Sequence, residues 1–264
     1  MSPAARRVWP RYVGFGVALY VVFLAATLPA SWLGAGLERM SGARLRLLEP
    51  SGTAWRGEGV LVPGANFPGP RPPRIRWQLS PLWLFAGRAR LAIESADPDA
   101  RLRSQLTLSR GELAVEDLDA ALPARLATTF YGPASYFGPE GTVRIQAKGI
   151  ELRSGHLSGE ASATWERAEL RGMGVRPAGT YRLQAKATGK RAEFKLTTLD
   201  GDLRVAAEGD WDWTQGGRLR AHGTAELAAP RSDIEPLLPM FGRDKGGGQR
   251  EFNVVWPLAL PRLL

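Results

Sequence analysis

The chain has 264 residues, 44% of them hydrophobic, and a net charge of +9 at pH 7. This hydrophobic content excludes a wholly disordered chain and is enough for one large domain or two small ones. Cysteine is absent, which excludes disulfides, thiolate metal sites and cysteine nucleophiles, so stability must come from a core and a hydrogen-bonded sheet.

The first element in chain order is an uncharged apolar run, residues 12–31, that follows three arginines. As a helix it would cross roughly 30 Å of hydrocarbon, because each residue adds about 1.5 Å. The arginines predict that residues 1–11 form a cytoplasmic tail, that 12–31 form a single transmembrane helix and that 40–264 lie beyond the membrane. The side chains expected to hold this anchor in the bilayer and at its interfaces are Trp9, Tyr12, Leu19, Phe23, Leu24 and Trp32.

A cleaved secretory signal peptide is the alternative for this segment, since it too would begin with positive charge. The apolar run is longer than the usual stretch of about 7–15 residues. A cut after Ala30 would also place Leu28 where a small side chain is required. Both features favour an anchor that is retained.

Period-two alternation dominates the rest of the chain. In residues 141–149, Val143, Ile145 and Ala147 alternate with polar residues, which is typical of an antiparallel strand with one buried face. Turn sequences such as that at 200–202 separate these segments. We therefore predict a mainly β domain, an antiparallel meander folded as a sandwich or as an open curved sheet. The alternating segments are 87–94, 101–108, 141–149, 181–187, 192–197, 202–209 and 218–227, and residues 75–79 and 251–256 are also expected to form strands.

Four segments interrupt this pattern. Residues 80–85 predict a short apolar turn, and the proline-rich stretch 63–73 predicts a loop. Residues 118–131 and 234–241 predict single helical turns or short helices that prolines interrupt.

Residues typical of catalysis are sparse. His156 and His222 are the two histidines, and neither has a second histidine or a carboxylate at metal-ligand spacing. The sequence contains neither a serine-hydrolase elbow nor a phosphate-binding P-loop. The arginines are scattered singly along strands, which indicates solvated faces and not a nucleic-acid surface. We therefore expect no enzyme, no cofactor, no metal and no nucleic-acid partner.

Two motifs have specific spacing, G-T-x-W-x-G and W-x-L-x-P-L-x-x-x-x-G. Further similarities lie at 26–30, 199–205, 209–211 and 236–242. In this order they resemble protein N of the bacterial type II secretion system, the general secretion pathway protein N family. The stretch 63–73 departs from that pattern and is expected to lengthen one loop. The fixed motif residues are Gly52, Trp55, Gly57, Trp77, Pro81, Leu82 and Gly87.

The resemblance implies a non-enzymatic subunit in the bacterial inner membrane, with its C-terminal domain in the periplasm. Such a subunit would contact other type II secretion subunits and contribute to assembly or stability of the export apparatus. The family offers no catalytic residues to transfer. The alternative is a periplasmic lipid-binding or lipid-transfer protein, because the one-sided strands also look similar to the sheets of AsmA-like bridge proteins, an analogy of architecture.

Overall fold

The computed structural model describes residues 5–64, 70–98, 100–130, 132–214, 217–246 and 248–257. The helical elements are α1 (Ala5–Ala26), α2 (Ala30–Met40), α3 (Pro81–Leu84), α4 (Ala127–Phe130), η1 (Ala124–Leu126), η2 (Gly132–Tyr136), η3 (Arg171–Met173) and η5 (Glu235–Phe241). The first seven strands are β1 (Leu45–Gly52), β2 (Arg56–Pro63), β3 (Arg74–Ser80), β4 (Ala89–Ser95), β5 (Arg101–Ser109), β6 (Glu112–Pro123) and β7 (Pro139–Arg153). The others are β8 (His156–Leu170), β9 (Val175–Gly189), β10 (Arg191–Gly201), β11 (Leu203–Asp212), β12 (Arg218–Leu227), β13 (Arg243–Gly246) and β14 (Gln249–Trp256).

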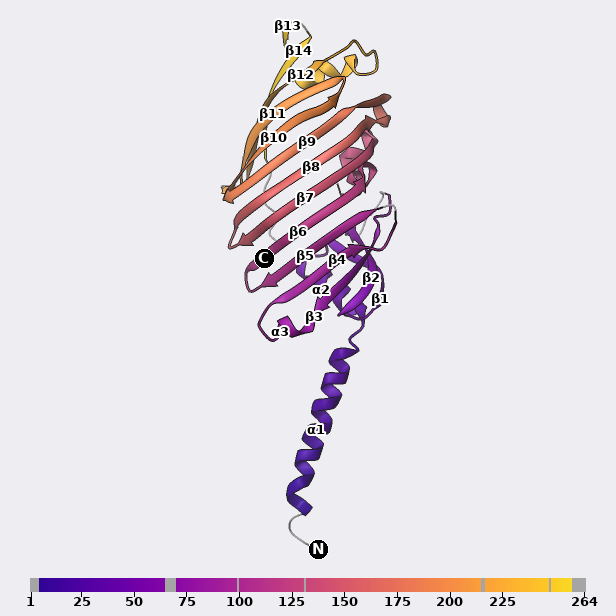
Figure 1. Ribbon diagram of the computed structural model, residues 1–264, viewed down its shortest axis with the longest axis vertical. Helices are drawn as coiled ribbons and strands as arrows, with labels where there is room; N and C mark the ends of the chain where they lie inside the picture. The colour runs from indigo at the N-terminus through magenta and orange to yellow at the C-terminus, as the bar shows by residue number, and fades with distance from the viewer. Residues whose placement is uncertain are drawn as a thin grey trace.

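All described strands belong to one open antiparallel sheet (Figure 1). Strands β1 to β12 follow one another in chain order, and the final hairpin reverses so that β14 lies beside β12 and β13 forms the edge. This arrangement confirms the mainly β meander. It also decides between the two expected forms, because the strands form a single open sheet and not a sandwich.

The predicted strand segments coincide with observed strands except at residues 87, 88 and 202, which lie just before β4 and β11. The expectation of a helical segment at 118–131 was wrong for its first half. Residues 118–123 complete β6, with Leu118 opposite Ala147 and Ala120 opposite Ile145. The alternation of β6 simply continues to Pro123, and helical geometry begins only at Ala124. The predicted turn at 80–85 contains α3, the predicted helix at 234–241 contains η5, and the described part of 63–73 connects β2 to β3.

The N-terminal segment differs from the single helix expected at 12–31. The first helix starts within the expected tail and ends at Ala26, and α2 begins at Ala30. Pro29 explains the break, because proline disfavours helical geometry at Leu28 and lacks a backbone N–H for a continuing helix. In Figure 1, α1 projects away from the β1 end of the sheet.

Within the described residues, none of the helices combines the length and the hydropathy of a membrane span.

The sheet has one apolar and one polar face, as the alternation predicts. A row of apolar residues runs across five strands in register, with Ile145 opposite Ala163, then Leu183, Leu196 and Ala207. Leu183 keeps 38% of its surface exposed, so this face is not fully covered.

The opposite face carries ion pairs between register partners on neighbouring strands. Arg103 meets Glu94 at 3.3 Å, and Lys186 meets Glu160 at 2.9 Å. These side chains are well exposed, so each pair contributes little, roughly 0–1 kcal/mol. Carboxylates on neighbouring strands therefore neutralise much of the positive charge of the strand arginines.

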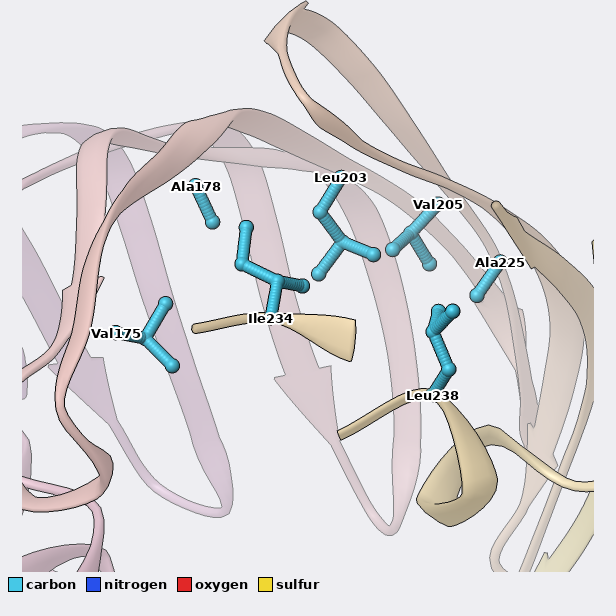
Figure 2. Close-up of a cluster of buried hydrophobic side chains, with 7 residues drawn as sticks. All are labelled: Val175, Ala178, Leu203, Val205, Ala225, Ile234 and Leu238. Atoms are coloured by element: carbon cyan, nitrogen blue, oxygen red, sulfur yellow. The ribbon is translucent and has the colours of Figure 1, made fainter. Parts of the chain in front are cut away.

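A buried apolar cluster closes the far end of the apolar face (Figure 2). Ile234 is fully buried, and it points with Leu238 toward Leu203, Val205 and Ala225 on the sheet. Segment 231–241 therefore acts as a lid over β11 and β12.

Arg231 fastens this segment to the sheet. Its guanidinium donates to the Pro177 carbonyl at 2.9 Å and binds the carboxylates of Asp202 and Asp233. The backbone N–H of Arg176 donates to Asp233 at 3.1 Å. The Arg231 guanidinium lowers the pKa of Asp233 to about 2.

We expect Asp233→Asn to destabilise the protein in a pH-dependent way. Because the pKa of Asp233 is depressed in the folded state, its contribution is complete above the unfolded value of 3.8 and is lost as the pH falls toward 2. The difference in melting temperature between wild type and variant should thus be constant from pH 7 to pH 5 and shrink below pH 4. A difference that does not change with pH would contradict this role.

Candidate functional site: the joint between α1 and the sheet

The motif G-T-x-W-x-G forms the joint at which α1 meets the sheet. The indole N–H of Trp55 donates to the carbonyl of Ala25 at 2.7 Å. This carbonyl belongs to the last turn of α1, where the N–H groups of the helix itself no longer reach it, and it also accepts the Leu28 N–H at 3.3 Å. Next to it, the N–H of Ala54 donates to the Leu28 carbonyl at 2.8 Å, and Pro29 forms a bridge with Thr53. The end of α1 is therefore hydrogen-bonded into the β1–β2 connection.

A compact turn shapes that connection. The N–H of Thr53 donates to the Arg56 carbonyl at 2.8 Å, and the Thr53 hydroxyl accepts the Arg56 N–H at 3.1 Å. Gly52 has φ +86°, a left-handed conformation that favours glycine, and a Cβ there would lie 2.6 Å from the Arg56 carbonyl. This geometry explains why the motif begins with glycine followed by threonine.

Trp77 of the second motif packs against the first motif and hydrogen-bonds to it. Its ring covers Gly57, where a Cβ would lie 2.5 Å from the indole and 2.4 Å from the Ser51 carbonyl. The Trp77 indole N–H donates to the Ala54 carbonyl at 3.3 Å, and the side chain is only 3% exposed. The Leu79 N–H donates to the Trp55 carbonyl at 2.7 Å, so β3 contacts the joint at Leu79 as well as at Trp77.

The α2 helix completes the joint by packing on β1. Ala30 at its start is 2% exposed. The face at Gly34 is close to the sheet, since a Cβ there would meet Leu47 at 3.5 Å. Leu47 in turn fills the space above Gly59 of β2, where an added Cβ would lie 2.9 Å away. Small residues on α2 and on β2 thus make room for Leu47 of β1 between them.

The last three motif residues shape the turn that contains α3. Pro81 occupies the first position of α3, where its missing N–H costs nothing. Gly87 has φ +69°, and its N–H donates to the Leu84 carbonyl at 3.0 Å, which ends the turn. Leu82 points away from the core and is 76% exposed. The structure thus brings Gly52, Trp55, Gly57 and Trp77 together and places Pro81, Leu82 and Gly87 in the turn that follows β3.

The residues predicted to anchor the chain lie on the two N-terminal helices. Tyr12, Leu19, Phe23 and Leu24 on α1 are exposed by 73%, 61%, 62% and 48%, and Trp32 on α2 is exposed by 67%. The side chain of Trp9 lies outside the described residues. These exposures are compatible with a role in lipid, which is taken up below as a proposal.

The groups near the end of α1 that bind the motif residues could not be identified from the sequence. Ala25, Leu28 and Pro29 are the groups that the motif binds, and they lie about thirty residues earlier in the chain. The only sequence signal was the Leu-Pro break in the apolar run. Hydrogen bonds between a backbone carbonyl and a distant indole leave no pattern in the sequence.

Outside the joint, the described surface carries a shallow hollow on the sheet and the two histidines noted in the sequence. A shallow hollow of about 780 Å³ lies over the polar face of β7–β12, where Lys186 pairs with Glu160 at 2.9 Å and the His222 ring lies 3.2 Å from the Glu208 carboxylate. His156 lies in the β7–β8 turn, next to the Ser154 carbonyl. In the part of the chain that the structure describes, no group of three or more His, Cys, Asp or Glu side chains could hold a metal ion.

Comparison with known proteins supports the resemblance carried by the motifs. A family model described as type II secretion system (T2SS), protein N, matches residues 43–253. No match was found among curated proteins or among solved structures. The matched region contains every strand from β1 to β13 and both motifs, while α1 and α2 lie before it. The match covers well over half of the chain, so the chain belongs to the type II secretion system protein N family.

Proposed function

We propose that the chain is a non-enzymatic subunit of the type II secretion apparatus that resides in the bacterial inner membrane. In this proposal α1 spans the membrane with residues 1–11 toward the cytoplasm, and the sheet stands in the periplasm. There it contacts other secretion subunits and supports their assembly or stability. Family membership supports the secretion role, and the anchor is argued from α1 itself.

The observation that carries the anchor is the contrast between the two ends of α1. Its C-terminal end is hydrogen-bonded to Trp55 and the neighbouring backbone, while its large apolar side chains from Tyr12 to Leu24 are 48–73% exposed. An apolar surface of this kind is unfavourable in water, at about 25 cal/mol per Å². A bilayer would cover it, and the joint would then hold the sheet at a fixed distance from the membrane.

The open sheet supports the proposed contacts with partner subunits. Among the described strands, β1 and β13 form the two edges of the sheet, each with one side that no other strand pairs, and such edges can accept an added strand. The edge strand β13 is short and carries Arg243, Asp244 and Lys245, which discourages unspecific pairing between copies.

Deletion of the gene tests the secretion role. We expect exported cargo proteins to accumulate in the periplasm and the levels of other inner-membrane secretion subunits to fall, with both defects rescued by the full chain. Co-purification from solubilised membranes should recover those subunits with the tagged chain. Normal secretion together with normal subunit levels in the deletion strain would contradict the proposal.

The partly open apolar face favours lipid binding as a second candidate function. The row from Ile145 to Ala207 forms a continuous apolar surface across five strands, and Leu183 at its centre is 38% exposed. Acyl chains could lie along such a surface, while the ion pairs of the opposite face stay in water.

Photocrosslinking in cells distinguishes this candidate. A benzoylphenylalanine at position 183 should yield adducts with the mass of a phospholipid, whereas the same group at position 182, on the polar face, should not. Both positions lie in β9, so expression and distance from the membrane are matched. Equal adduct yields at the two positions, or no lipid adduct at 183, would remove lipid binding from consideration.

A further inference from the structure

The turn around α3, which connects β3 to β4, is a small apolar projection at the ends of these two strands. Four consecutive side chains are exposed, Leu82 by 76%, Trp83 by 40%, Leu84 by 42% and Phe85 by 92%. Neither the hydrogen bonds of the joint nor the core of the sheet accounts for this exposure. Contiguous exposed apolar side chains of this kind mark a surface that is covered in the working state of a protein.

This projection is held in a defined shape. Pro81 starts the helical turn, and Gly87 ends it with a left-handed conformation. The N–H groups of Ala86 and Arg88 both donate to the Trp83 carbonyl at 3.0 Å. The apolar side chains are thus presented by an ordered turn.

The turn lies close to the point at which α1 leaves the sheet. Leu79, two residues before α3, donates its N–H to the Trp55 carbonyl, and the Trp55 indole donates to Ala25 near the end of α1. In Figure 1, α3 lies at the same end of the sheet as the junction with α1. A bilayer spanned by α1 up to Ala26 would therefore have its surface close to the level of α3.

The composition of the turn matches the boundary between acyl chains and headgroups. The guanidinium of Arg90 lies 5.6 Å from the centre of the Trp83 ring, and a bond to Glu116 at 2.9 Å holds it there. Tryptophan is enriched at this boundary, where its ring sits at headgroup level, and arginine keeps its charge in the water or near phosphates. Leu82 and Phe85 supply the apolar surface that enters the acyl region.

We propose that residues 82–85 insert into the interfacial layer of the membrane that α1 spans, as a second, peripheral membrane contact. This inference rests on the proposed anchor and adds a function for the motif residues Pro81, Leu82 and Gly87. With α1 and the α3 turn both held by the membrane, and both joined to β3 and the β1–β2 connection, the sheet would have a fixed tilt above the bilayer.

Depth measurement with a fluorescent probe tests this contact. The chain contains no cysteine, so Phe85→Cys, Leu82→Cys, Phe15→Cys and Ser232→Cys each carry a single thiol for an environment-sensitive label. Each full-length variant is reconstituted into vesicles of phosphatidylethanolamine and phosphatidylglycerol that contain a spin-labelled quencher lipid. Position 15 reports on α1, and position 232, which is exposed at the far end of the sheet, gives the value for a probe in water.

We expect labels at positions 82 and 85 to show blue-shifted emission and quenching several-fold stronger than at position 232, with the strongest quenching at position 15. Quenching at 15 together with water-like emission at 82 and 85 would overturn the interfacial contact, leave the anchor intact and point to a protein as the occupant of the turn. Water-like emission at position 15 as well would overturn the anchor and the inference together.

Discussion

Trp77→Ala is expected to lower the free energy of unfolding by about 3–5 kcal/mol, the range for removing a large buried aromatic side chain. Trp77 is 3% exposed, covers Gly57 and donates to the Ala54 carbonyl, so its loss leaves both a cavity and an unpaired acceptor inside the joint. Urea unfolding of the detergent-solubilised full chain, followed by circular dichroism, measures the change.

Trp83→Ala is the matched control for this prediction, because it removes the same side chain from an exposed position only a few residues away. Trp83 is 40% exposed, and we expect a loss below about 1 kcal/mol, as for most surface substitutions. Equal losses for the two variants would show that Trp77 does not organise the joint.

Gly57→Ala should also be strongly destabilising, although it adds a single methyl group. That methyl would lie 2.4 Å from the Ser51 carbonyl and 2.5 Å from the Trp77 ring, so the β1–β2 hairpin or the indole must move. Overpacking of this kind costs about 1–3 kcal/mol. The steady-state level of the variant in cells and the yield of secreted cargo should fall together.

Gly36→Ala provides the comparison for Gly57→Ala. A Cβ at Gly36 meets no atom within 4 Å, and alanine is the better helix former by about 1 kcal/mol. This variant should be as stable as the wild type or more stable, with normal secretion. If Gly57→Ala were equally well tolerated, the close packing between the two motifs would not matter for the fold.

The meander could be predicted wherever large apolar residues alternate with charged ones, as in β7 or β11. The strands that escaped prediction have weak alternation for a physical reason. In β8, small residues such as Gly159, Ala161 and Ala163 occupy the apolar face, so the contrast with the polar face is slight. In β2, Gly57 and Gly59 leave room for Trp77 and Leu47, which lie elsewhere in the chain. Such spaces are set by tertiary contacts.

The joint, too, could be predicted only in part from the sequence. The spacing of the motifs singled out Trp55, Gly57 and Trp77 as unusual, but nothing in that spacing indicates that the Trp55 indole binds the end of α1. The break between α1 and α2 follows from Pro29. In the structure, the carbonyls of Ala25 and Leu28 at this break accept hydrogen bonds from Trp55 and Ala54 of the motif. Long-range pairing of backbone groups leaves no periodic pattern in a sequence.

Labelling with a membrane-impermeant maleimide tests most directly whether α1 is a retained stem that holds the sheet outside the cytoplasm. Because the chain has no cysteine, Ser232→Cys and Ser2→Cys each present one thiol. In cells with a permeabilised outer membrane, the thiol at position 232 should be modified, and the thiol at position 2 only after lysis. Modification at position 232 only after lysis, or recovery of mature chain without its first thirty residues, would contradict this arrangement.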